Sequence, residues 1–209
     1  MFITDRDSKI IQTLGLKVRV MSFNQIASLW WNNTVSGRIL AKNRLKLLVQ
    51  YNFLNCLYVN AHPMLKIKGP IFSWMPGDTE PDSKSLSNFL FKRLSKQPNM
   101  TTVYTLSRKS KNMIGSGAKP FNPLHATHDI HVSEVYLFLL KNDIESAEAW
   151  ISEDMITKRG KGLVDPDAVL NYSSLRPKLF VEFCGKYDAK RIDHFHSDCQ
   201  NNNQGYQLW

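Results

Sequence analysis

Three segments in the first quarter of the chain show apolar side chains at helical spacing. Apolar residues recur every three or four positions there, as they do on one face of an α-helix. Thr4 is expected to cap a first helix over 5–14, and Ser22 with Gln25 has capping-box spacing at the start of a second helix that ends near residue 32. A third helix is expected over 34–54. The side chains expected to face inward are Ile10, Ile11 and Leu14, then Phe23, Ile26, Leu29 and Trp30, then Val35, Ile39, Leu45, Leu48 and Val49.

Two short apolar runs, 55–59 and 70–74, follow the third helix and have the length of β-strands. Three helices followed by a two-stranded hairpin make a helix-turn-helix with a wing. Lys66 and Lys68 lie between the two runs, so we expect them near the wing tip.

A turn-rich stretch over 76–83 separates this part from the rest of the chain. We therefore predict a winged-helix domain over 1–75, a linker over 76–83 and a second domain over 84–209. The elements expected in the second domain are a helix over 83–96, a strand over 101–106, a basic Gly/Ser-containing loop over 107–119, a helix over 129–141, strands over 149–152, 165–170 and 178–183, and a helix over 188–200.

Composition places the 209-residue chain among ordinary folded proteins, since 43% of its residues are hydrophobic and 22% are charged. Its net charge of +9 is unevenly distributed. Residues 1–120 carry 18 Lys/Arg and 5 Asp/Glu, whereas residues 121–209 carry 9 and 13. The first part is therefore suited to meeting phosphate, and the second is richer in carboxylates.

The third expected helix contains only basic charged residues, which are Arg38, Lys42, Arg44 and Lys46. A solvated helix face usually mixes both signs of charge, so this pattern favours contact with DNA. The alternative is a three-helix bundle whose basic face is merely solvated. The loop over 107–119 leaves a similar choice open, between a clamp on the DNA backbone and a flexible connection.

Three carboxylates of the second domain lie in apolar surroundings. Glu134 falls between Val132 and Val135 in the expected helix, Asp167 follows Pro166 at the start of one strand, and Glu182 lies within the next strand. Adjacent strands can bring Asp167 and Glu182 to one end of a sheet, where two carboxylates need a divalent cation. Magnesium or manganese there would polarise a phosphodiester, with Glu134 as a third oxygen ligand. The alternative for each carboxylate is a structural or surface role.

The order of the expected elements resembles that of the PD-(D/E)xK nuclease superfamily. It runs from a helix with Glu134 through a strand with Pro166-Asp167 and a strand with Glu182 to a final helix. That resemblance implies an α+β chain in which an N-terminal winged helix-turn-helix precedes a restriction-endonuclease-like α/β domain. Glu134, Asp167 and Glu182 would be its catalytic and metal-binding residues. The superfamily's lysine stands two residues after the glutamate, where this chain has Cys184, so Lys186, Lys190 or Arg191 would have to replace it.

Four stretches of the chain are similar to MOBC-type plasmid mobilisation relaxases and to the broader replication-relaxation family. They are the segment from Glu182 to His196, the terminal Tyr206–Trp209, His128-Asp129 and Pro166-Asp167-Ala168. The resemblance implies nicking of one DNA strand at a transfer origin with Mg²⁺ or Mn²⁺, and accessory mobilisation or coupling proteins as partners. Tyr187 and Lys190 would join the catalytic residues, although a packing or hydrogen-bonding role is the simpler interpretation of Tyr187.

Other features exclude several classes of protein. Cys56, Cys184 and Cys199 fit neither a disulfide framework nor a zinc pattern, so a reducing cytoplasm is expected. No apolar run is long enough to cross a membrane, and the start of the chain lacks signal-peptide features. His194 and His196 would face different sides of a helix and cannot form a metal pair there.

The alternative function is that of a winged-helix accessory or regulatory protein with an inactive nuclease-like domain.

Overall fold

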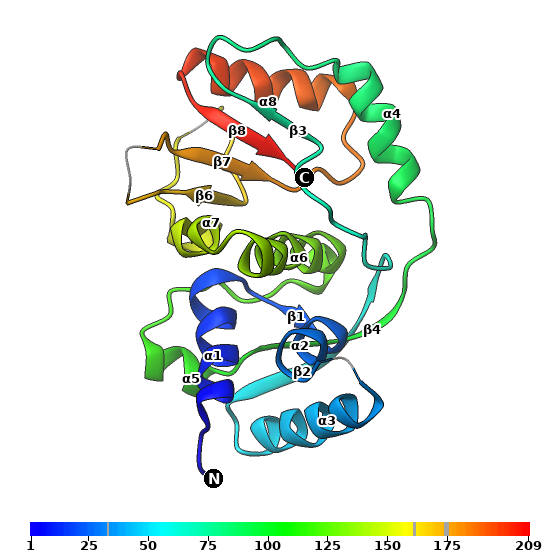
Figure 1. The fold of residues 1–209 in the computed structure, drawn as a ribbon, viewed down its shortest axis with the longest axis vertical. Helices are drawn as coiled ribbons and strands as arrows, with labels where there is room; N and C mark the ends of the chain where they lie inside the picture. The colour runs from blue at the N-terminus through cyan, green and yellow to red at the C-terminus, as the bar shows by residue number, and fades with distance from the viewer. Residues whose placement is uncertain (33, 161, 174–175) are drawn as a thin grey trace. The chain divides into compact units, whose positions relative to one another are not determined.

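A computed structural model of the protein describes residues 1–32, 34–160, 162–173 and 176–209 and has an α+β fold. The chain divides into two compact units, and each unit is made of two separate chain segments (Figure 1). Unit 1 consists of Met1–Ala61 and Pro98–Leu137, and unit 2 consists of His62–Gln97 and Phe138–Trp209.

Unit 1 combines helices with an antiparallel sheet in the strand order β1-β4-β2. β2 and β4 pair along their whole length, from Leu54 opposite Leu106 to Ala61 opposite Asn99. The elements of unit 1 are α1 (Asp5–Gln12), a π-helical turn (Thr13–Lys17), β1 (Met21–Ser22), α2 (Phe23–Trp30), α3 (Val35–Gln50), β2 (Leu54–Ala61), β4 (Asn99–Leu106), α5 (Arg108–Ile114) and most of α6 (Ala126–Asn142).

Both predicted helix caps are confirmed. The Thr4 hydroxyl accepts a hydrogen bond from the Asp7 backbone N–H, and the Asp7 carboxylate accepts one from the Thr4 N–H. Ser22 and Gln25 form the same reciprocal box at the start of α2. Each box satisfies backbone donors that the first turn of a helix leaves without partners.

The inward face of α3 differs from the predicted stripe. Gly37, Ala41, Leu45 and Leu48 are buried, whereas Val35 is 79% exposed and Ile39 is 56% exposed. A Cβ atom on Gly37 would lie 2.0 Å from the Trp31 carbonyl oxygen. Gly37 therefore occupies the interior face because α3 passes too close to the Trp31 backbone there for a side chain.

The expected wing hairpin between 55–59 and 70–74 is not formed. β2 pairs with β4, and β3 (Phe72–Trp74) pairs with β8 (Gly205–Leu208) in unit 2. The residues that connect β2 to β4 therefore belong to unit 2, and Lys66 and Lys68 do not lie at the tip of a hairpin between those two runs. The observed division also differs from the predicted domains 1–75 and 84–209, because β4 completes the sheet of unit 1 from beyond the expected linker.

Residues 107–119 begin with a short helix instead of a loop. Ser107 caps α5 by accepting a hydrogen bond from the Ser110 N–H, and Gly115 ends the helix in the left-handed conformation, with φ of 64°. A left-handed residue after the last turn is a common helix ending and is easiest for glycine.

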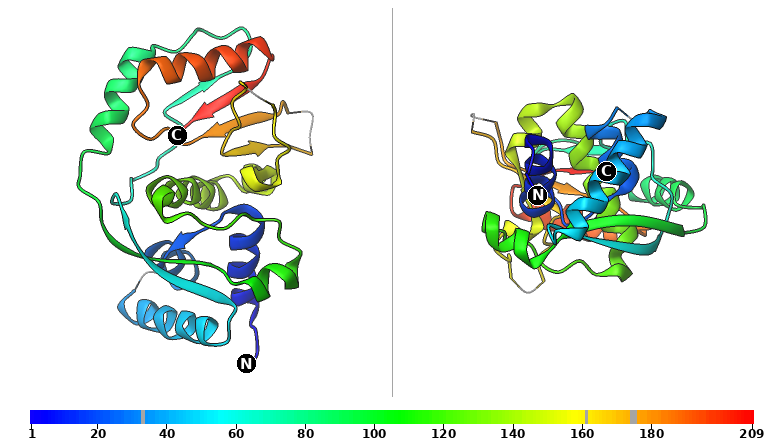
Figure 2. Two further views of the ribbon diagram at one scale, coloured as in Figure 1. Left: turned by 180° about the vertical axis from the view of Figure 1, so that it is seen from behind. Right: turned by 90° about the horizontal axis from the view of Figure 1, so that it is seen from below.

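Unit 2 contains a mixed sheet in the order β3-β8-β7-β6-β5. β7 and β8 run parallel, and the other neighbouring strands run antiparallel. Figures 1 and 2 show α8 along one face of this sheet and α7 on the other side. The remaining elements are α4 (Ser83–Arg93), α7 (Ile144–Ala149), β5 (Trp150–Ser152), β6 (Ala168–Leu170), β7 (Leu179–Glu182) and α8 (Ala189–Asn201).

An aromatic-rich core holds α4 and α8 against the sheet of unit 2. It includes Trp74, Phe180, Phe195 and Tyr206, all buried. The Phe195 and Tyr206 rings meet edge to face with centroids 5.2 Å apart, a favourable aromatic geometry.

All three cysteines are free thiols. Among the helices that the structure describes, none combines the length and apolar character needed to span a membrane.

Candidate functional site

The strongest candidate site lies where β6 begins and β7 ends. Asp167 directly precedes β6, and Glu182 is the last residue of β7. The two strands are antiparallel with Ala168 opposite Val181, so these carboxylates come to the same end of the sheet. Asp167 Oδ2 accepts a hydrogen bond of 2.7 Å from the backbone N–H of Phe183. The structure therefore brings together two of the three predicted carboxylates.

Tyr187 links Glu182 to a cation. The Tyr187 hydroxyl donates a hydrogen bond to Glu182 Oε1 at 2.5 Å and accepts one from Arg191 Nη2 at 2.7 Å. The guanidinium of Arg191 also lies 3.7 Å from the centroid of the Tyr187 ring. Burial and the Glu182 carboxylate raise the pKa of Tyr187 far above its ordinary value. Tyr187 is therefore protonated at neutral pH and donates a hydrogen bond to the carboxylate.

Cys184 occupies the position at which the resembling nucleases carry a lysine. It is buried, and burial together with the Glu182 charge raises the pKa of its thiol well above the ordinary value. Cys184 thus supplies no charge at neutral pH. Lys190 is exposed, and among the described residues it forms no hydrogen bond or ion pair, so it is not held beside either carboxylate.

Arg93 is a cation near this strand end that sequence reasoning did not single out. Its Nη2 donates to the carbonyl oxygens of Cys184 and Trp209, at 2.5 and 2.6 Å, and its guanidinium lies 4.8 Å from the centroid of the Phe183 ring. Burial lowers the pKa of Arg93 to about 10, which still leaves it protonated at neutral pH. A basic pair at the end of a helix is too common a pattern to have marked it.

Glu134 belongs to unit 1 and has a partner there. Gln25, which caps α2, donates from Nε2 to Glu134 Oε2 at 3.0 Å and to the Ile130 carbonyl oxygen at 2.9 Å. This arrangement accounts for the carboxylate in an apolar helix face.

In the part of the chain that the structure describes, no three His, Cys, Asp or Glu side chains are grouped so that they could hold a metal ion.

Two carboxylates nevertheless suit magnesium or manganese. Mg²⁺ prefers oxygen ligands and is commonly held by one or two carboxylates, with waters and substrate phosphates in its other positions. Asp167 and Glu182 meet that description at one sheet end. The donor set therefore suits an ion that keeps open coordination positions and does not suit a closed protein cage.

The predicted DNA-binding residues of α3 fall into two groups. Lys42 and Lys46 are exposed, and Arg38 is half-buried with its Nη2 on Asn24 Oδ1 at 2.7 Å. Arg44 instead binds the buried carboxylate of Asp7 through Nε and Nη2 and also donates to the Phe2 carbonyl oxygen. Arg44 is thus part of the packing between α1 and α3.

Lys66 and Lys68 lie in unit 2. Together with Arg93, Phe89 and neighbouring residues they line a cavity of about 360 Å³. They remain candidates for binding an anion.

Comparisons with known proteins give no relative for this chain: no family model, no curated protein and no solved structure matches it. Its function is therefore inferred from the geometry of the two units.

Proposed function

We propose that this protein is a DNA-processing enzyme in which unit 1 binds DNA and unit 2 nicks one strand with a divalent metal ion. The resemblance to mobilisation relaxases suggests a transfer origin as the substrate. The observation that carries the proposal is the meeting of Asp167 and Glu182 at one end of neighbouring strands.

Unit 1 supports DNA binding by its element order. We take the succession α1, β1, α2, α3, β2, β4, with β4 between β1 and β2, as support for a winged helix-turn-helix. The usual wing loop is replaced by residues 62–97. α3 would then be the recognition helix, on which the exposed Lys42 and Lys46 and the half-buried Arg38, also bonded to Asn24, would meet phosphates, while Arg44 binds Asp7.

Unit 2 supports cleavage by its sheet. Three antiparallel strands, β5, β6 and β7, are followed by α8 and then by β8, which is parallel to β7. We take Pro166-Asp167 before one strand, Glu182 in the next and the helix that follows as support for the proposed likeness to the PD-(D/E)xK nucleases. Arg93, bonded to the Cys184 carbonyl oxygen, and Arg191, bonded to the Tyr187 hydroxyl, would replace the missing lysine.

A bound Mg²⁺ or Mn²⁺ would polarise the scissile phosphodiester and lower the pKa of an attacking water. Asp167 and Glu182 would hold the ion. The Phe183 N–H and the Tyr187 hydroxyl would orient these two carboxylates, since each donates to one of them. Supporting hydrogen bonds of this kind fix metal-ligand geometry in other proteins.

A second candidate function is DNA binding without cleavage. The buried, uncharged Cys184 in the lysine position favours it, because the resembling nucleases place a cation there. Such a protein would keep the basic α3 and would use unit 2 as a structural or regulatory part.

A nicking assay on supercoiled plasmid DNA with Mg²⁺ or Mn²⁺ decides between the two candidates. The wild-type chain should nick, whereas Asp167→Ala and Glu182→Ala should not. Asp193→Ala, which removes an exposed carboxylate from α8, is the matched control and should retain activity. Absence of nicking by the wild type with either metal, while DNA binding persists, would establish the second function.

DNA binding is tested separately by its salt dependence. Neutralising Arg38, Lys42 and Lys46 together should weaken binding and reduce the slope of log K against log salt by about 2 to 3, because each lost phosphate contact contributes about 0.9. Neutralising the exposed Lys84, Lys92 and Lys96 of unit 2 removes the same charge and should leave the slope nearly unchanged. Equal effects of the two triple variants would exclude α3 as the binding element.

A further inference from the structure

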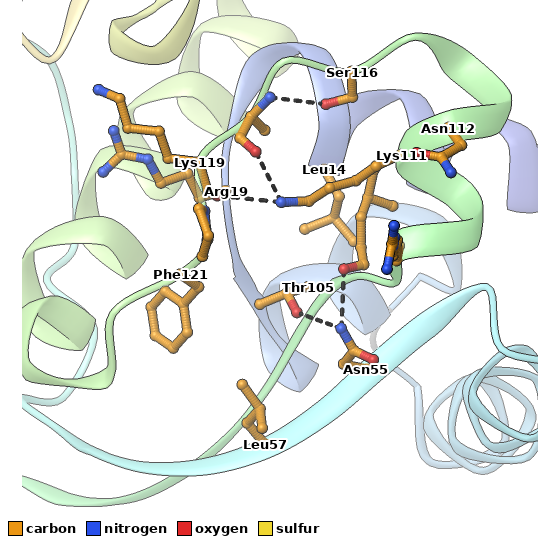
Figure 3. A pocket seen from close by; sticks show the side chains of 14 residues that line it. Leu14, Arg19, Asn55, Leu57, Thr105, Lys111, Asn112, Ser116, Lys119 and Phe121 are labelled. Carbon is orange, nitrogen blue, oxygen red and sulfur yellow. Dashed lines mark hydrogen bonds between the residues drawn. The ribbon is translucent and has the colours of Figure 1, made fainter.

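A pocket of about 470 Å³ lies within unit 1, on residues that belong neither to α3 nor to the proposed cleavage centre. Its walls come from α5, from the segment that follows α5, and from the β2–β4 sheet (Figure 3). Ligand pockets for small molecules typically measure roughly 300 to 1,000 Å³. The volume is therefore sufficient for a small organic ligand.

The charged side chains of the pocket lining are all basic. They are Arg19, Arg108, Lys111 and Lys119, and the lining contains no Asp or Glu. Arg19 lies 3.8 Å from the Asp129 carboxylate outside the lining, so the pocket retains a net positive charge. Cations gathered along a concave surface focus the electrostatic field and attract an anion.

The α5 wall of this pocket is fixed by buried hydrogen bonds. Ser107 Oγ donates to the Asn52 carbonyl oxygen at 2.6 Å, and Ser110 Oγ donates to the Phe53 carbonyl oxygen at 2.7 Å. Both serines are buried. These bonds anchor the start of α5 to the turn between α3 and β2, so Arg108 projects from a fixed frame.

The opposite wall is tied to α5 as well. Lys111 Nζ reaches across the pocket to the carbonyl oxygens of Ala118 and Lys119, at 2.8 and 3.3 Å (Figure 3). Ser116 Oγ donates to the Gly15 carbonyl oxygen at 2.6 Å. The segment that carries Lys119 and Phe121 is therefore held in place, and the pocket is preformed.

The remaining lining is apolar or carries amides. Leu14, Leu57 and Phe121 supply apolar surface, and Asn55 lies on the sheet with its amide nitrogen donating to the Leu106 carbonyl oxygen at 2.9 Å. A simple inorganic anion would leave the apolar surface without contacts, and an apolar ligand would leave the four cations without a counter-charge. The lining suits a ligand with both a phosphate and a flat ring.

We propose that this pocket binds a single nucleotide, either free or as one unit of a DNA single strand. Arg108 and Lys119 neutralise the phosphate at the rim, and the base packs against Phe121 and Leu57. Arginine and lysine pairing with phosphate, and stacking of a base on an aromatic ring, are the usual means of binding single-stranded nucleic acid. The inference goes beyond the proposed function, because cleavage in unit 2 does not require this pocket.

The test measures binding of dAMP, a twelve-residue oligo-dT and inorganic phosphate to the full chain in EDTA, so that metal-dependent cleavage plays no part. Arg108→Gln and Lys119→Gln should each weaken dAMP or oligo-dT binding about tenfold. Phe121→Ala should weaken dAMP or oligo-dT binding but leave inorganic phosphate binding unchanged. Lys9→Gln, which removes an exposed charge from α1, is the matched control and should bind like the wild type.

The two sources of the nucleotide give different outcomes. Binding of dAMP would show that a free nucleotide is sufficient, whereas binding of oligo-dT alone would show that a DNA strand is required. Either result supports the proposal if the pocket variants bind the probe more weakly and Lys9→Gln binds it like the wild type. Failure of both probes to bind would overturn the proposal. An effect of Lys9→Gln equal to that of Arg108→Gln would overturn it too, because the attraction would then be general. Asp167→Ala should bind these probes normally, which separates this test from that of nicking.

Discussion

Replacing Arg44 with alanine tests whether this residue belongs to the fold of unit 1 or to its DNA-binding surface. Its guanidinium meets the fully buried Asp7 carboxylate, with Nε 3.0 and 3.1 Å from the two carboxylate oxygens. Removing one partner of a buried ion pair costs about 3 to 5 kcal/mol, because the other charge is left without compensation. The Arg44 side chain is 25% exposed, so water can partly replace it and we expect a loss of about 2 to 4 kcal/mol.

The stability that Arg44→Ala loses depends on pH, because the Asp7 carboxyl group titrates. Burial on its own would raise the pKa of Asp7, but hydrogen bonds from Arg44 and Thr4 outweigh it and hold the pKa below the ordinary value of 3.8. A carboxyl group whose pKa is depressed by folding adds stability above its unfolded pKa, and this stability is lost as pH falls through the folded value. The difference between wild type and Arg44→Ala should therefore be full near neutral pH and should shrink below about pH 4.

Hydrogen exchange followed by mass spectrometry on peptides from α1 and α3 measures this loss locally, which avoids assuming that two units unfold together. Lys42→Ala is the matched control, because it removes an exposed cation from the same helix and should leave protection unchanged. Unchanged protection in Arg44→Ala at neutral pH, or a difference that grows toward acid pH, would refute the reasoning.

Four further substitutions test the packing described above. Gly15→Ala places a Cβ 2.4 Å from Ile114 Cδ1 and 2.7 Å from Leu106 Cδ1, so it should destabilise unit 1 by about 1 to 3 kcal/mol, measured as faster exchange in α5. Tyr187→Phe removes a donor from the buried Glu182 and should cost unit 2 about 1 to 3 kcal/mol in urea unfolding. Nicking should fall by about 10- to 100-fold because Glu182 loses the bond that orients it, whereas complete loss of nicking in a folded variant would point to a nucleophilic tyrosine. Val35→Ser should change stability by less than about 0.5 kcal/mol, whereas Leu45→Ala should cost about 2 to 5 kcal/mol, and the reverse order would contradict the observed face of α3.

Local chemistry in the sequence predicted local structure well. The boxes at Thr4 and Ser22 involve side chains only three residues apart, so their spacing alone indicates where α1 and α2 begin. The interior of α3 was predicted less well, because hydropathy ranks Val35 and Ile39 above Gly37 and Ala41. The tight approach of Gly37 to Trp31 is a tertiary constraint that no local pattern carries.

Long-range pairing explains the other differences. Asp167 and Glu182 were placed correctly because their strands are neighbours both in sequence and in the sheet. β3 was assigned to a nearby partner, but its partner β8 lies at the other end of the chain. Likewise, Glu134 was grouped with the other carboxylates by its apolar surroundings, whereas Gln25 accounts for that carboxylate from a distant helix.

The interleaving of the two units along the chain limits how the protein can be shortened. A fragment ending near residue 75 would lack β4, the middle strand of the sheet in unit 1, and would leave both of its neighbours with unpaired edges. Because Ala61 faces Asn99, a tight turn in place of residues 62–97 could close β2 onto β4 and would lower the loop-closure cost by roughly 2 kcal/mol. An autonomous first unit thus needs excision of residues 62–97 as well as an end near Leu137, and during synthesis the ribosome must produce residues 62–97 of unit 2 before unit 1 can complete its sheet.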